Sequence, residues 1–304
     1  MKRVLLTGAS GFIGRHCIDP LLERGYEVHA VSSGSDGRAD PGIEWHRANL
    51  LEPGKAQGLV REIDPSHLLH LAWFVVPGQL ITSPENYAWV SFSLDLIRAF
   101  VERGGERITV SGSGYEYDWS YGYCSEDLTP AVPDTVYGAC KQGLNLLVQS
   151  MAGHDDLSVA WGRVFFLYGP GEHPRRLVSS VINSLLDGDP ARCSHGRQIR
   201  DYLHVQDVAD GLVALLDSQV EGSVNVSSGQ AVTLREIVLT IGRILDREDL
   251  IQLGALPARA NDVPLVVGNN SRLLNEVGWT RQLDLEAGLR QTIDWWKNER
   301  NSGA

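Results

Sequence analysis

The first half of the chain alternates short, almost uninterrupted apolar runs with longer segments of helical periodicity. The apolar runs predict strands at Arg3–Leu6, Glu27–Val31, Ile43–Trp45, His67–Leu71, Arg107–Ser111 and Ser158–Arg163. The intervening segments predict helices near Phe12–Arg24, Gly54–Ile63, Pro84–Arg103 and Thr135–Ala152. Apolar strands alternating with helices are typical of a parallel sheet covered on both faces. We therefore expect a Rossmann-type, doubly wound α/β fold with a ligand crevice at the carboxyl ends of its strands.

The pattern in the second half is less regular. It predicts helices at Arg175–Leu186, Asp207–Leu216, Leu234–Leu245 and Leu285–Trp296, and short strands at Leu203–Val205, Ser223–Val226 and Leu265–Val267. We expect residues 1–165 to form the sheet domain, with residues 199–228 returning to it. Residues 166–198 and 229–304 are expected to form a smaller, interleaved C-terminal lobe.

Composition and charge narrow the class of protein. The 304 residues are 43% hydrophobic and 21% charged, which is ordinary for a soluble globular protein. The formal net charge of −11 gives nucleic-acid binding little electrostatic support. We expect no membrane span, because no apolar stretch reaches about 18 residues. The N-terminal apolar run enters a glycine loop after about five residues, so we do not interpret it as a signal peptide.

The cysteines and histidines lack the spacing of metal ligands. We interpret Cys17, Cys124, Cys140 and Cys193 as free thiols of a cytoplasmic protein. His70, His173, His195 and His204 are expected to have core or loop roles. The sequence analysis therefore predicts no metal site.

A glycine loop follows the first predicted strand. Its glycines recur every third residue in Thr7–Gly14, and a helix follows. Gly8 is suited to a tight turn, Gly11 to close approach of a pyrophosphate, and Gly14 to packing of the helix against the sheet. The helix N-terminus would offer free N–H groups to the phosphates. We predict dinucleotide contacts at Gly8, Ser10, Gly11, Phe12, Ile13 and Gly14; a purely structural turn is the alternative.

The end of the second strand bears on the choice of dinucleotide. NAD sites usually place an Asp or Glu there to bind the adenosine ribose, whereas this chain has Ser32-Ser33-Gly34. A missing carboxylate removes repulsion against a 2′-phosphate, which Ser32, Ser33 and Arg38 or Arg15 could hold. We therefore expect NADP, with NAD bound through fewer ribose contacts as the alternative.

A tyrosine and a lysine lie four residues apart, at Tyr137 and Lys141, on one face of a predicted helix. An ammonium group near a phenol favours the phenolate, so we expect Lys141 to lower the pKa of Tyr137 and to make it an acid or base near neutral pH. Ser113, after the preceding strand, is placed to hydrogen-bond the reacting oxygen. Such a pair alone often marks only a solvated helix face.

Together these residues resemble the extended short-chain dehydrogenase/reductase family of nucleotide-sugar epimerases, dehydratases and reductases. The resemblance spans nearly the whole chain. It includes Thr7–Gly14, His70-Leu71-Ala72, Tyr137–Lys141, Gly162-Arg163, Tyr168-Gly169-Pro170, Gln198–Val205, Asp207-Val208-Ala209, Asn225–Gly229, Arg259–Asp262 and Gly278-Trp279.

The resemblance implies residue roles. It makes Tyr137 the catalytic acid/base, Lys141 its partner and Ser113 the hydroxyl that polarises the substrate. Arg200 and Arg259 match arginines that bind the phosphates of the nucleotide, although a surface or interlobe ion pair is the alternative for each. Further contacts implied are Asn49, Leu50, Leu71 and Ala72 for the cofactor, and Phe166 and Leu177 for the substrate. The resemblance also implies a homodimer built from two helices of each sheet domain.

The chain departs from the family pattern at several positions. Family dehydratases carry an Asp-Glu pair after the active-site Ser or Thr, where this chain has Gly114-Tyr115, so dehydration would require Glu116 or Asp118 as substitutes. Asn49 replaces an Asp that contacts adenine, Phe166 replaces a substrate-binding Asn, and Trp89-Val90-Ser91 replaces an Asn-rich stretch. The aromatic-rich segment Tyr115–Asp127 is either a pocket wall or a packed lobe contact.

These observations predict an NADPH-dependent reductase of a 4-keto nucleotide sugar. The alternative within the family is a 4-epimerase that keeps NAD bound. Alternatives of other kinds are a non-catalytic NADP-sensing protein and a reductase of a small ketone that carries no nucleotide. Arg200 and Arg259 argue against the small ketone, and the set Ser113, Tyr137 and Lys141 argues against the sensor.

Overall fold

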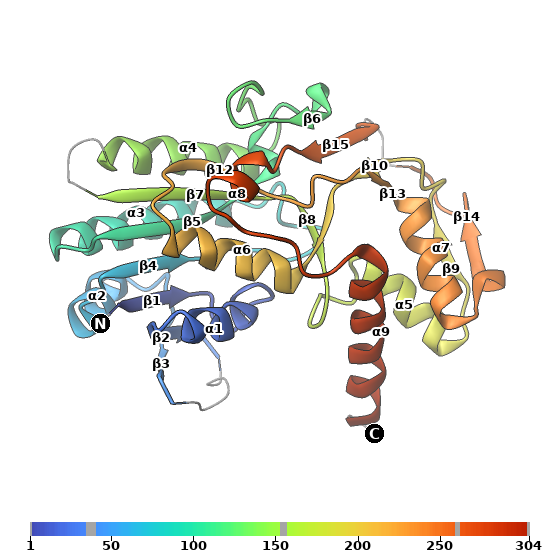
Figure 1. Ribbon diagram of the computed structural model, residues 1–304, viewed down its shortest axis with the longest axis horizontal. Coiled ribbons are helices and arrows are strands. Elements are labelled where there is room, and N and C mark those ends of the chain that lie inside the picture. The colour runs from blue at the N-terminus through green and yellow to red at the C-terminus, as the bar shows by residue number, and fades with distance from the viewer. Residues whose placement is uncertain (1, 35–40, 153–156, 259–261, 303–304) are drawn as a thin grey trace.

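The computed structural model describes residues 2–34, 41–152, 157–258 and 262–302. Its main feature is a seven-stranded parallel sheet (Figure 1). From one edge to the other the strands are β12 (Gly222–Val226), β7 (Ser158–Val164), β5 (Arg107–Ser113), β4 (His67–His70), β1 (Arg3–Thr7), β2 (Glu27–Ser32) and β3 (Ile43–Arg47). The sheet contains the predicted strands of the first half and Ser223–Val226, and it confirms the predicted fold class.

Helices cover both faces of this sheet. On one face lie α2 (Lys55–Ile63), α3 (Glu85–Glu102) and α4 (Val136–Ala152), and on the other lie α1 (Gly14–Glu23) and α6 (Val205–Asp217). Neighbouring residues of β4 show the alternation, since Leu68 packs into the core beneath α2, α3 and α4 and Leu69 into the core beneath α1 and α6. Burial on both faces explains why the strands are apolar at almost every position.

Most of the rest of the chain forms a smaller lobe at the carboxyl ends of the strands (Figure 1), whereas the segment with Leu273 and Trp279 packs into the core beneath α1 and α6. Its core lies among α5 (Leu177–Asp187), α7 (Leu234–Leu245) and α9 (Leu285–Ser302). The remaining elements are short: β6 (Tyr123–Cys124), β8 (Phe166–Tyr168), β9 (Ala191–Cys193), β10 (Ile199–Arg200), β11 (Tyr202–His204), β13 (Val232–Thr233), β14 (Ile251–Leu253), β15 (Leu265–Gly268) and α8 (Ser271–Asn275). A mixed four-stranded sheet runs in the order β13-β10-β15-β6.

Two predicted boundaries in this half are wrong. The strand predicted at Leu203–Val205 ends at His204, and Val205 begins α6 ahead of the predicted start at Asp207. The reason is a cap: the His204 side chain accepts a hydrogen bond from the backbone N–H of Gln206 and starts the helix there. In addition, α9 continues beyond Trp296 to Ser302.

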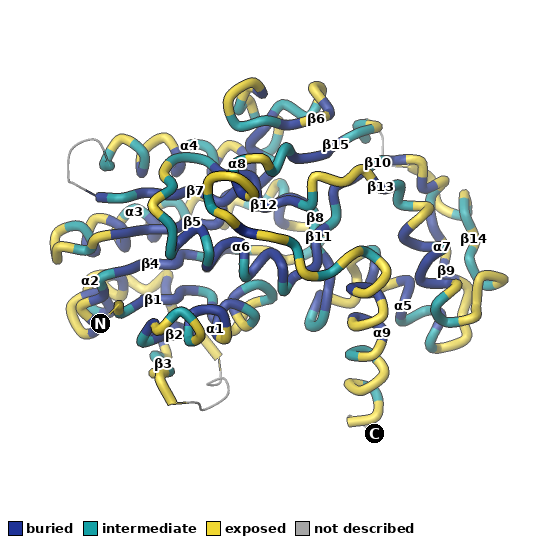
Figure 2. The backbone as a smooth tube through the Cα atoms, in the orientation of Figure 1, coloured by how far each residue is buried: buried dark blue, intermediate teal, exposed yellow. Residues whose placement is uncertain are grey.

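The distribution of burial follows this architecture. The central strands are buried along most of their length, whereas the last turns of α9 are largely exposed (Figure 2). Among the described residues, none of the helices combines the length and apolar character needed to cross a bilayer.

Candidate active site

The glycine loop between β1 and α1 is shaped by contacts that only glycine permits. Gly8 has φ 73°, and a Cβ there would lie 2.8 Å from the backbone nitrogen of Ala72. The N–H of Gly11 donates to the carbonyl of Gly8 at 2.9 Å. A Cβ on Gly14 would overlap that same carbonyl, so Gly14 fits against the turn itself, not against the sheet as the sequence suggested. The loop thus leaves its backbone open in front of a helix N-terminus, which suits a diphosphate.

The end of β2 is tied to this loop. The Ser32 hydroxyl is buried and donates to the Ser10 hydroxyl at 3.1 Å, while Ser33 is exposed. Arg15 lies against the loop, because its guanidinium donates to the carbonyls of Ser10 and Gly11 at 3.0 and 3.1 Å. Arg38, the other cation predicted to bind a 2′-phosphate, lies outside the described residues.

The loop after β4 contributes the next part of the crevice. The backbone N–H groups of Leu71 and Ala72 donate to the carbonyl and hydroxyl of Thr7 at 3.2 and 3.3 Å. The Thr7 hydroxyl also contacts Nδ1 of His70 at 2.7 Å, and Nε2 of His70 contacts the Ser93 hydroxyl at 2.8 Å. Burial lowers the pKa of His70 to about 3, so this imidazole is neutral and joins β1 and β4 to α3.

Asn49 and Leu50 follow β3 at the same end of the sheet. Leu50 is buried, and Asn49 is exposed with its side-chain oxygen accepting from the N–H of Leu51 at 3.3 Å. Phe12 and Ile13, in the glycine loop, are half-buried. These side chains and the loops at Gly8 and Leu71 therefore lie along one edge of the sheet, as expected for parallel strands.

Ser113, Tyr137 and Lys141 form a buried cluster where β5 ends against α4. Tyr137 and Lys141 occupy successive turns of α4, and Ser113 is the last residue of β5. Burial raises the pKa of the Tyr137 phenol, and a hydrogen bond with the Ser113 side chain opposes that shift without cancelling it. The phenol is therefore protonated near neutral pH.

The predicted effect of Lys141 on Tyr137 is wrong in this structure. The Lys141 ammonium donates to the carbonyl of Ser111 at 2.7 Å and lies 3.7 Å from the ring centroid of Trp73. Burial lowers the pKa of Lys141 to about 7, and Lys141 is not among the groups that act on the Tyr137 phenol. Desolvation thus outweighs the expected attraction between the two side chains.

Trp73 is a site residue that the sequence analysis missed. Its indole N–H donates to the Asn86 side chain at 2.7 Å, and its ring meets that of Tyr137 edge-on with centroids 6.4 Å apart. Trp73 therefore packs on both members of the Tyr/Lys pair. The available signal was its position directly after Ala72, at the carboxyl end of β4, where the fold places its crevice.

Glu116 and Asp118, the suggested substitutes for the dehydratase acids, are both engaged elsewhere. The Glu116 carboxylate is completely buried and accepts from the backbone N–H of Ser113 at 2.7 Å, the indole of Trp161 at 2.9 Å and the guanidinium of Arg163 at 2.8 Å. Asp118 is at the surface and caps the short turn at Trp119–Tyr121. Neither carboxylate is placed for acid–base work in the crevice.

The aromatic segment Tyr115–Asp127 divides between the two predicted roles. The ring centroid of Tyr115 lies 5.8 Å from that of Tyr137 and 4.3 Å from that of Trp119. The ring centroids of Trp119 and Phe166 are 5.9 Å apart. Tyr117 instead packs beside Phe165, and its hydroxyl donates to Asn225. One side of the segment thus packs against Tyr137 of the buried cluster, and the other joins the lobe to the sheet.

The predicted substrate residues lie in the smaller lobe. Arg200 on β10 is buried, forms an ion pair with Asp262 at 2.6 Å and lies 5.5 Å from the ring of Phe166. Leu177 starts α5 and packs against the lobe core. Arg200 does form an ion pair, but the pair lies within the smaller lobe with its arginine buried, not at the surface or between the lobes as the alternative had it. Arg259 lies outside the described residues.

A cavity of about 750 Å³ opens beside the cluster. Trp73 lines it, together with Trp89 of α3, the exposed Val75 and Val76 of the loop after β4, and His173. Trp73 is the side chain that this cavity shares with the cluster, because its ring also contacts Tyr137 and Lys141.

Known proteins with similar sequences belong to one enzyme family. The sequence profile of the NAD dependent epimerase/dehydratase family matches residues 4–227. A UDP-glucose 4-epimerase of Mycolicibacterium smegmatis is 26% identical over 98% of this chain and 99% of its own. UDP-glucuronic acid decarboxylase 1 of Danio rerio is 25% identical over 98% of this chain and 73% of its own.

Solved structures agree with these relatives. A UDP-glucose 4-epimerase of Thermus thermophilus in complex with NAD superposes with a TM-score of 0.86 at 25% identity, covering 97% of this chain and 99% of its own. MoeE5 in complex with UDP-glucuronic acid and NAD gives a TM-score of 0.84 at 29% identity, covering 98% of this chain and 100% of its own.

Proposed function

Since the chain belongs to the NAD dependent epimerase/dehydratase family, we propose that it transfers a hydride at a ring carbon of a nucleotide sugar, with Tyr137 moving the proton. It is an enzyme of the NAD-dependent nucleotide-sugar epimerase/dehydratase family. The observation that carries the proposal is the buried phenol of Tyr137, hydrogen-bonded to Ser113 and one helical turn from Lys141.

Within this family we favour reduction of a 4-keto sugar. The phenol of Tyr137 is protonated near neutral pH, which suits a group that must donate a proton to a ketone oxygen. β2 ends in Ser32 without a carboxylate, which suits NADPH. Glu116 and Asp118 are held away from the crevice, which argues against dehydration.

The residues of this chain have distinct tasks in that reaction. A bound nicotinamide dinucleotide supplies the hydride, which adds to the carbonyl carbon of the sugar. Tyr137 donates its hydroxyl proton to the carbonyl oxygen as the hydride arrives, and Ser113 hydrogen-bonds the same oxygen. Lys141, one helical turn from Tyr137, would hold the nicotinamide ribose.

The described residues proposed to bind the cofactor lie at the carboxyl ends of the strands, and most of those proposed to bind the sugar lie in the smaller lobe. The glycine loop would hold the pyrophosphate, Asn49, Leu50, Leu71 and Ala72 the adenosine and nicotinamide moieties, and Ser32, Ser33 and Arg38 the 2′-phosphate. Arg200 and Arg259 would bind the nucleotide phosphates of the sugar, with Phe166 and Leu177 beside them. In this division residues 1–165, with α6 and β12 of the returning segment 199–228, bind the dinucleotide. Residues 166–198 and 229–304, together with Arg200 of β10, bind the sugar.

The second candidate is a nucleotide-sugar 4-epimerase that keeps NAD bound. It is favoured by the comparisons, because the two solved structures described above are NAD complexes and one of them is a UDP-glucose 4-epimerase. In this reaction Tyr137 would first remove the proton from the sugar hydroxyl and would later return it to the ketone oxygen. The bound NAD would accept the hydride from the ring carbon and supply it again to the opposite face of that carbon.

The cofactor released from purified, denatured protein separates the two candidates. A reductase is expected to bind added NADPH and to consume one equivalent per 4-keto nucleotide sugar reduced. An epimerase is expected to release tightly held NAD and to interconvert sugars without net cofactor use. Turnover of free ketones without a nucleotide would contradict both, and so would dinucleotide binding without turnover of any sugar.

We also propose a homodimer that forms through α3 and α4. Large apolar side chains are exposed on these helices, with Tyr87 59% exposed on α3 and Leu146 62% exposed on α4. Light scattering should give twice the chain mass, and Leu146→Glu should reduce it to the chain mass. A cytoplasmic location remains a prediction, supported by four buried cysteines without a disulfide bond.

A further inference from the structure

Two histidines and a glutamate converge at the edge of the main sheet, on neighbouring strands. His29 of β2 and Glu44 of β3 are opposite each other in the register, and His46 lies two residues further along β3. Nδ1 of His29 lies 2.9 Å from Nε2 of His46. The Glu44 carboxylate lies 3.7 Å from that same nitrogen of His29 and 3.9 Å from that of His46. Three ligand atoms therefore face one point.

The outer nitrogens of both imidazoles face carboxylates. Nε2 of His29 lies 3.3 Å from Glu27, and Nδ1 of His46 lies 3.5 Å from Glu62 of α2. The two inner nitrogens lie at hydrogen-bond distance, 2.9 Å, so one proton can be shared between them. With N–H groups on the outer nitrogens, a metal ion can take the place of that proton and accept both inner lone pairs.

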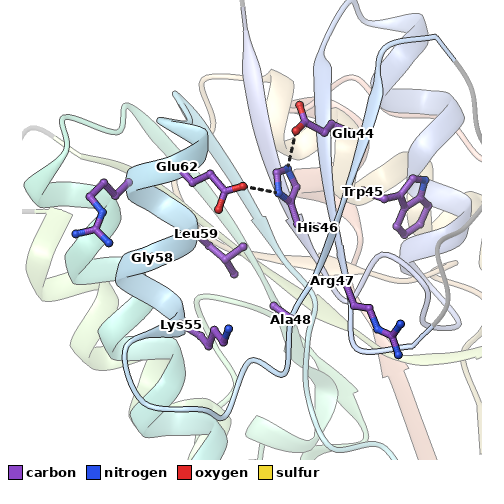
Figure 3. A pocket seen from close by; sticks show the side chains of 10 residues that line it. Glu44, Trp45, His46, Arg47, Ala48, Lys55, Gly58, Leu59 and Glu62 are labelled. Carbon is purple, nitrogen blue, oxygen red and sulfur yellow. Dashed lines mark ion pairs between the residues drawn. The ribbon is translucent and has the colours of Figure 1, made fainter.

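The surroundings of the cluster suit a metal ion. Imidazoles that bind a metal commonly donate their second N–H to a carboxylate, the arrangement seen at both histidines. The two imidazole side chains are only 7% and 8% exposed, whereas Glu44 is 65% exposed. An open groove of about 480 Å³ gives access from solvent (Figure 3). In Figure 3 the carboxylates of Glu44 and Glu62 flank His46, and Lys55 and Arg47 lie away from it.

We propose that His29, His46 and Glu44 form a binding site for a divalent transition-metal ion of the zinc class. Zn²⁺ takes nitrogen and carboxylate oxygen ligands at about 2.0–2.2 Å, so two imidazoles, one carboxylate and a water would complete a tetrahedral site. Bringing both nitrogens to that distance needs only a small separation of the two rings. The ion would link edge strand β3 to β2, because its ligands come from both strands. Glu62 would link the site to α2 through its contact with His46. The sequence analysis led us to expect no metal site. That expectation rested on His70, His173, His195 and His204 and did not include His29 or His46.

The test is calorimetric titration of untagged, chelator-treated protein with ZnCl₂ and with MgCl₂. We expect one Zn²⁺ per chain and no Mg²⁺ binding, because imidazole ligands select zinc over magnesium. His29→Gln and His46→Gln should each abolish Zn²⁺ binding. Glu62→Gln, which removes only an outer carboxylate, should weaken it by about 10-fold. His195→Gln, at an exposed histidine outside the cluster, is the matched control and should bind like the wild type.

Two further measurements keep the proposal falsifiable if a histidine variant fails to fold. Glu44 is exposed, so Glu44→Gln should fold normally and still lose most of its Zn²⁺ affinity. The Cu²⁺-loaded wild type should show electron paramagnetic resonance couplings from two nitrogens, and His46→Gln from one. The proposal is overturned if the wild type binds no Zn²⁺, if Glu44→Gln binds it unchanged, or if the Cu²⁺ spectrum shows no nitrogen coupling.

Discussion

Two buried polar clusters lie near Ser113, and they differ in how their charged side chains are compensated. In the first, Glu116 and Arg163 are 2.8 Å apart, and the carboxylate also accepts from Trp161 and from the backbone of Ser113. In the second, the Lys141 ammonium has a carbonyl and the face of Trp73 as partners, with burial lowering its pKa to about 7. In the first cluster the two charges are in direct contact. In the second, the Lys141 ammonium has no carboxylate in direct contact, although the Glu116 carboxylate attracts it from a distance and partly opposes the lowering of its pKa by burial.

This contrast distinguishes a buried charge that only stabilises the fold from a buried charge that is kept for the reaction. A paired and fully hydrogen-bonded charge fixes the position of its neighbours, here the backbone of Ser113, and performs no chemistry. A buried lysine without a carboxylate partner destabilises the fold, and it is retained where its charge is needed. The predictions below test whether the two clusters are as different as their contacts indicate.

The largest effect is expected from Tyr137→Phe, which removes the proton donor and leaves the ring packing intact. kcat with the best nucleotide sugar should fall by about 10²–10⁴-fold, the usual contribution of a general acid. The melting temperature and dinucleotide affinity should change little. Tyr121→Phe, at an exposed tyrosine, is the matched control and should keep wild-type kcat.

Breaking the ion pair should affect stability instead. Arg163→Met leaves the Glu116 carboxylate buried without its cation, so the free energy of unfolding should fall by about 3–5 kcal/mol in chemical denaturation. The double variant Arg163→Met/Glu116→Gln should lose less than the sum of the single changes, because it removes both charges. If the double variant loses as much stability as the two single variants added together, the two side chains do not act as a pair.

Lys141→Met should abolish turnover yet stabilise the fold at low pH. The pKa of Lys141 lies well below its unfolded value of 10.5, so below about pH 7 the folded protein bears the full cost of a buried ammonium. That cost decreases as pH rises from 7 to 10.5, where only the unfolded lysine still binds its proton. The gain at pH 6 should be on the order of 5 kcal/mol, since the pKa falls from 10.5 to about 7 and each pKa unit corresponds to about 1.4 kcal/mol.

Thermal unfolding of this variant from pH 6 to pH 10 is the measurement. A gain that shrinks with rising pH supports the account of Lys141. A loss of stability at pH 6 would mean that Lys141 is stabilised in a way that its contacts do not show.

A smaller effect is expected at Trp73. Trp73→Leu removes the ring that faces the Lys141 ammonium, and a buried cation–π contact contributes about 2 kcal/mol. kcat/KM should therefore fall by roughly 30-fold in steady-state assays. Trp89→Leu, at a tryptophan of the same cavity, serves as the control and should keep most of the activity.

The sequence predicted the larger sheet well because its strands are long and apolar on both faces, as in β5 and β7. The strands of two or three residues in the smaller lobe, such as β10 and β13, carry no periodicity and were missed. Their pairing depends on segments distant in sequence, since β10 pairs with Val232–Thr233 and Leu265–Val266.

Within the site, motif spacing predicted which residues converge but not their electrostatics. Tyr137 and Lys141 lie one turn apart as predicted, yet the pKa of Tyr137 is raised because burial is a property of the whole fold. The contact of Lys141 with Trp73 and the approach of His29 to His46 depend on how separate segments pack. No local pattern specifies such contacts.

The most direct test of the central role of Tyr137 is the nicotinamide absorbance at 340 nm, recorded in single-turnover mixing of dinucleotide-loaded enzyme with 4-keto and 4-hydroxy nucleotide sugars. The account predicts a change with at least one sugar in the wild type, slowed at least about 100-fold in Tyr137→Phe. An unchanged absorbance with every sugar, or an equal rate in Tyr137→Phe, would contradict it.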